Sequence, residues 1–393
     1  MHLCGLAAFL DLRTGGSFSM SFPALKIGDL TATTPIVQGG MGVGISLSRL
    51  ASAVANEGGI GVIAGAMVGM REPDVASNPI EANSRALRRE IETAREMTSG
   101  IIGVNIMVAL TTFADLVKTS VSAGADIIFS GAGLPMDLPK LYQETCEAYK
   151  KEFNTKLVPI VSSGRAATLI AKKWAAKTGL MPDAFVLEGP KAGGHLGFSK
   201  ENIFDEEYSL EKLVGGVVDA AKALEDKVGR AIPVICGGGV FSGADIARMI
   251  GLGASGVQMA TRFVATDECD ADIRFKQAYV EASEDDVTII QSPVGMPGRA
   301  LKGKFIEASR EGKKKPFKCV FHCIKTCDPD TTPYCISSAL INAMKGNLDK
   351  GFVFCGSNVG KVKSIMSVHD LMATLRREYD DFMRSFSAKT ALV

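Results

Sequence analysis

Eight short apolar runs, each followed by a longer stretch with helical spacing, constrain the fold of this chain most. The spacing is clear at Leu210, Leu213, Val214 and Val217, where apolar residues recur every three or four positions. Such alternation is typical of βα units that form a parallel sheet, and eight units match a closed (β/α)8 TIM barrel of about 250 residues. An open doubly wound sheet is the alternative, and the number of strands disfavours it. We expect the strands at residues 35–38, 60–64, 101–107, 126–129, 157–161, 184–187, 232–236 and 256–259.

The chain of 393 residues is long enough for this barrel and a second module. We expect a poorly ordered N-terminal extension at residues 1–19, because the sequence from Met20 onward resembles a natural start. The barrel would occupy residues 20–290. Prolines and glycines beyond residue 290 predict a loop, and residues 337–344 and 368–386 have helical spacing. We therefore expect a C-terminal loop and helical module at residues 291–393.

The charge balance predicts a small-molecule ligand held in a pocket. Lys and Arg number 44 against 43 Asp and Glu, which gives no reason to expect nucleic acid or an anionic membrane as partner. No apolar run approaches the roughly 20 residues of a membrane helix. Scattered cysteines resemble the reduced thiols of a cytoplasmic protein, which is the location that we expect. Whether the chain forms a homodimer stays open.

Glycine-rich loops follow several of the expected strands, on the face where TIM barrels bind their ligands. Phosphate sites of barrels often use the loops after strands seven and eight, where backbone N–H groups converge on the anion. Here those loops carry Gly237–Gly239 and then Ala260 and Thr261, so a phosphate-bearing cofactor is the simplest interpretation. Asn105 is a polar residue inside an apolar strand run and is suspected of binding a ligand.

His195 is the first candidate for a catalytic acid or base. It is one of four histidines, and it lies between Gly194 and Gly197 in the loop after strand six. An imidazole exchanges a proton near neutral pH, and the glycines allow a ligand to approach the backbone closely. A structural histidine is the general expectation for an isolated His, but this position favours a functional one.

Three motifs together resemble the nitronate monooxygenase family, formerly called 2-nitropropane dioxygenases. They are PIVQGGMG at 35–42, KAGGH at 191–195, and VICGGG at 234–239 followed by GVQMATRF at 256–263. The resemblance spans roughly residues 24–266. The same pattern occurs in the related FMN-dependent enoyl-acyl-carrier-protein reductases and NADH:quinone reductases, so the motifs indicate the superfamily and not one reaction.

The resemblance implies a barrel that binds FMN noncovalently, with His195 beside the flavin as catalytic residue. Gly39, Gly40 and Met41 would approach the flavin, and Asn105 its ring or ribityl chain. The residues that would surround the phosphate end are Gly194, Gly238, Gly239, Ala260 and Thr261, with Gln258 close by.

Two reactions are compatible with the resemblance. In the first, which we favour, FMN and O2 oxidise nitronates or nitroalkanes while His195 handles the acidic carbon proton. In the second, NAD(P)H reduces the flavin, which then reduces an enoyl thioester or a quinone. For the second, the basic residues 313–318 could contact a phosphopantetheine or nucleotide. Two further alternatives for this chain belong to a different functional class: a barrel that catalyses no reaction, and a barrel that binds a phosphosugar.

Four of the nine cysteines lie in one 17-residue window as Cys319, Cys323, Cys327 and Cys335. The first three are four residues apart, so they would form one stripe on a helix. Such thiolates could ligate an iron–sulfur cluster or zinc, with His322 off the stripe. The spacing lacks the CxxC signature, so we favour reduced structural thiols.

Overall fold

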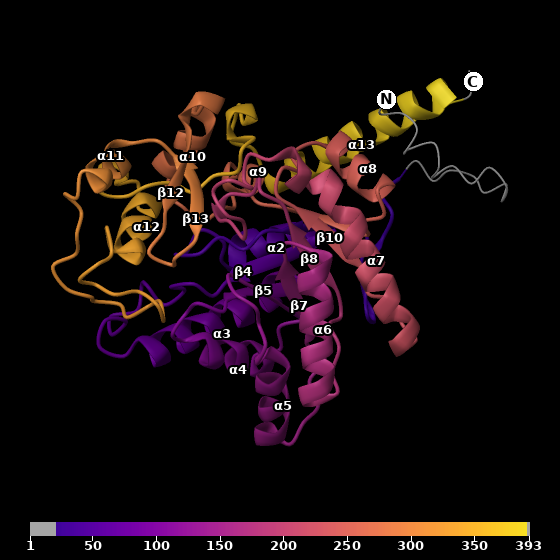
Figure 1. Cartoon of the computed structure of the whole chain (residues 1–393), viewed down its shortest axis with the longest axis horizontal. Helices are drawn as coiled ribbons and strands as arrows, with labels where there is room; N and C mark the ends of the chain where they lie inside the picture. Colours follow the sequence, from indigo (N-terminus) through magenta and orange to yellow (C-terminus); the bar gives the residue numbers. More distant parts are fainter. Residues whose placement is uncertain (1–20, 391–393) are drawn as a thin grey trace.

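The computed structural model describes residues 21–390 and contains a closed barrel of eight parallel strands (Figure 1). Around the barrel the order is β10-β11-β3-β4-β5-β6-β7-β8, so each strand pairs in parallel with its neighbours. The TIM barrel that the sequence predicts is therefore confirmed. The strands are β3 (Ile36–Gln38), β4 (Ile60–Ala64), β5 (Ile101–Met107), β6 (Ile127–Gly131), β7 (Lys156–Val161), β8 (Phe185–Glu188), β10 (Val234–Gly237) and β11 (Gly256–Met259).

The barrel strands are mostly apolar because both of their faces are covered. One set of side chains fills the barrel interior and includes Val62, Phe129 and Val186. At the opposite end from the ligand-binding face, an antiparallel hairpin closes the barrel; it is formed by β1 (Leu25–Ile27) and β2 (Leu30–Ala32). Leu25 and Ile27 of this hairpin belong to the same buried cluster as the interior side chains.

Seven helices follow the first seven barrel strands and cover the outside of the sheet. They are α2 (Ser48–Asn56), α3 (Pro79–Met97), α4 (Phe113–Ser122), α5 (Leu138–Tyr149), α6 (Gly164–Thr178), α7 (Leu210–Val228) and α8 (Gly243–Gly251). In α7 the expected stripe is buried, with Val214 and Val217 facing the core. At the start of α8, Ser242 and Asp245 form a capping box.

The eighth helix of the barrel comes from the far end of the chain. Only the four-residue α9 (Thr261–Val264) follows β11, and α13 (Val368–Thr390) packs against α8 and α2. The contact is close, because the backbone N–H of Gly243 donates to Glu378 at 2.8 Å and a Cβ at Gly243 would lie 2.2 Å from the Tyr379 nitrogen. The helix therefore fills the gap that β11 would otherwise leave.

Residues 265–367 form a long insertion between α9 and α13, which lies at one end of the barrel (Figure 1). Its strands β12 (Val287–Gln291) and β13 (Pro297–Leu301) pair with each other and with β9 (Gly194–His195) in an antiparallel sheet. Its helices are α10 (Ile273–Glu281), α11 (Lys304–Arg310) and α12 (Ile336–Met344). Its short 3-10 turns are η2 (Glu284–Asp286), η3 (Leu348–Lys350) and η4 (Val359–Lys361). A further 3-10 turn, η1 (Glu206–Tyr208), precedes α7 outside the insertion.

The expected boundary at residue 290 lies inside β12, and the partner strand β13 occupies part of the expected loop. The two expected helices are present as α12 and α13, but α13 packs on the barrel. The prediction of a poorly ordered segment at 1–19 lies outside the described residues. No helix between residues 21 and 390 is long and apolar enough to cross a membrane.

Candidate functional site

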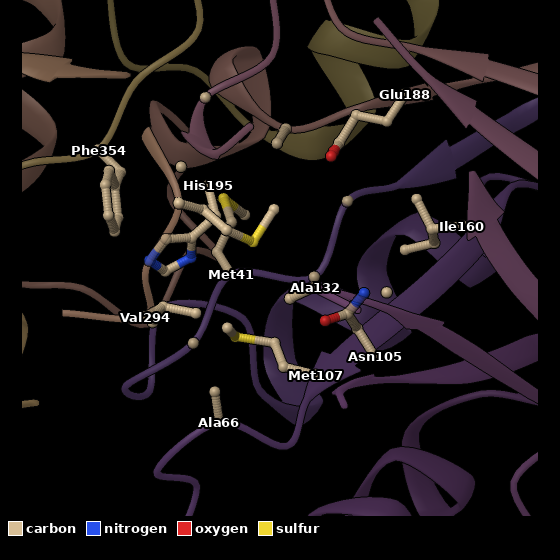
Figure 2. Close-up of a pocket in the computed structure, with 18 of the residues that line it drawn as sticks. Met41, Ala66, Asn105, Met107, Ala132, Ile160, Glu188, His195, Val294 and Phe354 are labelled. Atoms are coloured by element: carbon tan, nitrogen blue, oxygen red, sulfur yellow. The ribbon is translucent and has the colours of Figure 1, made fainter. Parts of the chain in front are cut away.

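A cavity of about 470 Å³ opens at the carboxyl ends of the barrel strands (Figure 2). Loops one to six and loop eight contribute to its wall, and the insertion supplies the opposite side. Lining residues from the barrel include Met41, Asn105, Met107, Glu188 and His195. Those from the insertion include Val294, Met296, Ile336, Leu340 and Phe354. The lining is mostly apolar, with a few polar groups, as in sites for organic ligands.

The imidazole of His195 is fixed at the wall of this cavity by contacts with the insertion. Its Nε2 lies 2.8 Å from the Ser292 hydroxyl, which also accepts a hydrogen bond from the Val294 N–H. Phe354 packs against the ring with 5.1 Å between ring centroids and an edge-on angle of 65°. In the tautomer with Nε2 protonated, Nε2–H donates a hydrogen bond to the Ser292 hydroxyl oxygen, and Nδ1 remains free as a base.

The insertion also holds the backbone of the His195 loop in place. The loop's strand β9 pairs with β13, with His195 opposite Gly298. The buried guanidinium of Arg299 donates to the backbone oxygens of Pro190 and Ala192. Burial lowers the pKa of Arg299, but the side chain stays charged at neutral pH because its ordinary pKa is so high. Loop six is therefore preorganised by two elements that lie about a hundred residues further along the chain.

Two titratable groups that face the cavity have pKa values shifted by burial. Desolvation lowers the pKa of His195 to about 4, so the imidazole is uncharged at neutral pH. Desolvation raises the pKa of Glu188 to about 7. In Figure 2 the Glu188 carboxyl group, at the end of β8, points toward the cavity. Protonated, it donates a hydrogen bond, and ionised, it only accepts one.

Glycine is required where two strand-end loops come close to their neighbours. A Cβ at Gly40 would lie 2.4 Å from the Cβ of Asn105, so only glycine brings loop one against that side chain. Gly238 has φ +89°, and a Cβ there would lie 2.6 Å from the Gly189 oxygen. Both glycines thus bring backbone close to the ends of strands three and six.

Three non-glycine residues of the cavity wall adopt the left-handed backbone conformation. They are Val43, Met67 and Ala132, with φ of 53°, 54° and 51°. This conformation is strained for a β-branched residue such as Val43, and strain of this kind is concentrated at functional sites. The geometry therefore independently indicates that these loops are shaped for a ligand.

Comparison with known protein families gives a match over most of the chain. A sequence profile of the nitronate monooxygenase family matches residues 24–378, which include the barrel, the insertion and part of α13. The chain belongs to the nitronate monooxygenase family. The protein is thus an oxidoreductase.

Two relatives of this chain have names that describe different reactions. A carboxyl-CoA dehydrogenase of Mycobacterium tuberculosis is 29% identical over 280 residues, which cover 71% of this chain and 66% of that protein, just under two thirds of its length. A probable nitronate monooxygenase of Staphylococcus aureus is 28% identical over 307 residues, covering 71% of this chain and 78% of that protein.

Solved structures show the same architecture. FabK from Thermotoga maritima has a TM-score of 0.68 at 27% identity, over 90% of this chain and 95% of that one. Nitroalkane oxidase from Streptomyces ansochromogenes has a TM-score of 0.67 at 19% identity, over 92% and 98% of the two chains, and shows the shared fold.

The structure brings most of the sequence-predicted site residues to one cavity. Those that line it are Gly39, Gly40, Met41, Asn105, Gly194, His195, Gln258, Ala260 and Thr261. Gly238 and Gly239 do not line it and directly follow the end of β10. The backbone oxygen of Gly239 accepts a hydrogen bond from Asn358 of the insertion.

Several residues of the site were missed by the sequence reasoning. Glu188 had a local signal, since a carboxylate directly follows the apolar run of strand six. Ser292, Arg299 and Phe354 had none, because they lie far from the barrel motifs and reach His195 only through the antiparallel sheet and its neighbours. Their roles depend on tertiary structure.

The cysteine window does not form the helical stripe that its spacing suggests. Cys319, Cys323 and Cys327 lie in a segment without helix between α11 and α12, so the stripe is wrong. Pro316 and Pro329 flank the three cysteines, and between them His322 has φ 43°, which is incompatible with a right-handed helix. The segment instead docks on loop three, where Leu110 pairs with Ile324. Within residues 21–390 no group of three or more His, Cys, Asp or Glu side chains is arranged to hold a metal ion.

Proposed function

We propose that this protein is an FMN-dependent oxidoreductase that oxidises nitroalkanes or their nitronates with O2. The observation that carries the proposal is the imidazole of His195, held by Ser292 and Phe354 at the wall of a mostly apolar cavity in a nitronate monooxygenase family member. An uncharged imidazole accepts a proton from a carbon acid, and oxidation of a neutral nitroalkane requires removal of that proton.

The cavity has the chemistry that FMN needs. Gly40 and Asn105 meet without room for another side chain, which provides a flat wall for a ring system. Gly39 and Met41 would complete that wall, and Gly194 with Gln258 would border the rest of the cofactor. Ala260 and Thr261 would contact the phosphate with backbone N–H groups and one hydroxyl, whereas Gly238 and Gly239, which follow the neighbouring strand β10, do not line the cavity. Bound FMN would supply the redox chemistry, which protein side chains here do not provide.

The protein's own part in the reaction is to position the substrate and move its proton. Methionines and aliphatic residues around His195 exclude water from the substrate carbon. Ser292 and Phe354 hold the imidazole in one orientation, with Nδ1 as the proton acceptor. A protonated Glu188 would donate a hydrogen bond into the cavity, and its ionisation near pH 7 would remove that donor.

A second candidate is the NAD(P)H-dependent reduction of an enoyl thioester. The apolar lining that the insertion adds to the cavity favours it, since Val294, Ile336 and Leu340 could contact an acyl chain. The basic residues 313–318 lie on the segment whose Ile324 lines the cavity, where an anionic carrier group could bind. FabK, an enoyl-acyl-carrier-protein reductase, is similar in structure, and one relative carries carboxyl-CoA in its name.

An absorption spectrum and an anaerobic comparison of reductants test these candidates. We expect a flavin spectrum from the purified protein that bleaches rapidly when a nitronate is added without oxygen. Rapid bleaching by NADH or NADPH, and none by the nitronate, would refute the oxidation of nitronates and support the reductase. A colourless protein that binds no added FMN would refute both and leave a phosphosugar-binding or noncatalytic barrel.

A further inference from the structure

Residues 355–358 of the insertion cross the barrel face between loops six, seven and eight. Three hydrogen bonds fix them there. The Ser357 N–H donates to the Lys191 oxygen at 3.1 Å, the Gly356 N–H to the Thr261 hydroxyl at 3.1 Å, and the Asn358 side-chain amide to the Gly239 oxygen at 2.7 Å. This segment therefore contacts each of the three loops that surround the proposed phosphate position.

Segment 355–358 lies so close to loops six and eight that no side chain would fit at the glycines between them. A Cβ at Gly193 would lie 2.5 Å from the carbonyl carbon of Cys355, and one at Gly356 would lie 2.8 Å from the Thr261 hydroxyl oxygen. The cavity itself is bordered by Cys355, Gly356 and Thr261. Cys355 and Gly356 are thus a fixed part of the wall, and Ser357 is the next residue along the chain.

The hydroxyl of Ser357 has an unsatisfied hydrogen-bonding capacity at this place. Its oxygen is buried, and no group within residues 21–390 lies within hydrogen-bonding distance of it. The segment uses its backbone groups to reach Lys191 and Thr261, so the free hydroxyl is not needed to hold the segment in place. A buried hydroxyl without a partner destabilises a protein, which indicates that a bound group supplies the missing acceptor.

We propose that segment 355–358 completes the phosphate end of the cofactor site and that the Ser357 hydroxyl donates a hydrogen bond to the phosphate. The inference rests on the proposed binding of FMN. It adds to the barrel loops a ligand from a segment about a hundred residues beyond the last barrel strand. A hydroxyl bound to a charged oxygen forms a stronger bond than one between neutral groups, so its loss affects affinity measurably.

Titration of the full-length, flavin-free protein with FMN and with riboflavin tests the proposal by quenching of flavin fluorescence. Riboflavin shares the ring and ribityl chain but lacks the phosphate. We expect Ser357→Ala to weaken FMN binding about tenfold or more and to leave riboflavin binding unchanged. Ser357→Thr retains a hydroxyl and should restore most of the FMN affinity. Ser338→Ala on α12, which does not line the cavity, is the matched control and should match wild type.

The outcomes separate this inference from the proposed function. Wild-type affinity for FMN in Ser357→Ala would overturn the inference and leave FMN binding intact. Equal weakening for FMN and riboflavin would also overturn it, because the serine would then act on the fold and not on the phosphate. If wild type binds neither flavin, the proposed function fails and the inference falls with it. Thermal unfolding of each variant identifies any loss of folded protein.

Discussion

At the scale of single residues, the site combines two buried titratable groups with opposite pKa shifts. The pKa of His195 is lowered to about 4 from an ordinary 6.5, and that of Glu188 is raised to about 7 from 4.5. Both groups are therefore favoured in their uncharged forms. The stabilising effect of uncharged His195 is present above pH 6.5 and is lost as the pH falls through 4. That of uncharged Glu188 is present below pH 4.5 and is lost as the pH rises through 7.

The Glu188 shift predicts how a neutral replacement changes stability. Glu188→Gln keeps the shape and cannot ionise, so we expect it to be more stable than wild type by roughly 3 kcal/mol at pH 8 and similar to wild type at pH 4. Urea unfolding at the two pH values measures the difference. Asp349→Asn replaces an exposed carboxylate and should show no such pH dependence. An equal effect of Glu188→Gln at both pH values would contradict the raised pKa.

The hydrogen bond between His195 Nε2 and the Ser292 hydroxyl predicts a second effect on the site. Removing it in Ser292→Ala should lower kcat with a nitroalkane about tenfold while flavin content stays unchanged, because the imidazole loses the partner that fixes its tautomer and orientation. Ser292→Thr keeps the hydroxyl and should retain most of the activity. Unchanged kcat in the alanine variant would show that the serine does not position the base.

At the scale of elements, the insertion at 265–367 carries a large part of the site. Its sheet with β9 orients His195, and its segment 355–358 borders the glycine loops. The strands of the barrel were predictable because each is a short, mostly apolar run, and most of them are followed by a glycine within a few residues. Strand β9 was not, because its two residues lie in a glycine loop and pair only with a distant strand. Strand β13, with a proline and a glycine at its start, resembles a loop in sequence.

The close packing of Gly193 on Cys355 predicts a matched pair of glycine variants. Gly193→Ala forces the segment away from loop six, so we expect a loss of roughly 1–3 kcal/mol in unfolding free energy and weaker flavin binding. Gly215→Ala lies on the exposed face of α7 with nothing within 4 Å of the added Cβ, and it should raise stability by about 0.5–1 kcal/mol. Equal effects of the two substitutions would contradict the packing.

At the scale of the whole molecule, one barrel is closed by both ends of the described chain. The N-terminal hairpin covers one end of the barrel, and α13 fills the place of the eighth helix after an excursion of about a hundred residues. The motifs at 35–42, 191–195 and 256–263 predicted one wall of the cavity, since parallel strands end at the same face. The opposite wall could not be predicted, because Val294, Ile336 and Phe354 lie there only through the path of the insertion.

The central claim is that His195 is the base of a flavin-dependent oxidation in this cavity. The rate of anaerobic flavin reduction in His195→Ala, with a neutral nitroalkane and with its preformed nitronate, tests it most directly. The nitronate has already lost the carbon proton and does not need the base. We expect the variant to retain FMN, to react with the nitroalkane at least about 100-fold more slowly than wild type, and to keep most of its rate with the nitronate. An equal loss with both substrates, or no reduction of wild type by either, would contradict the claim.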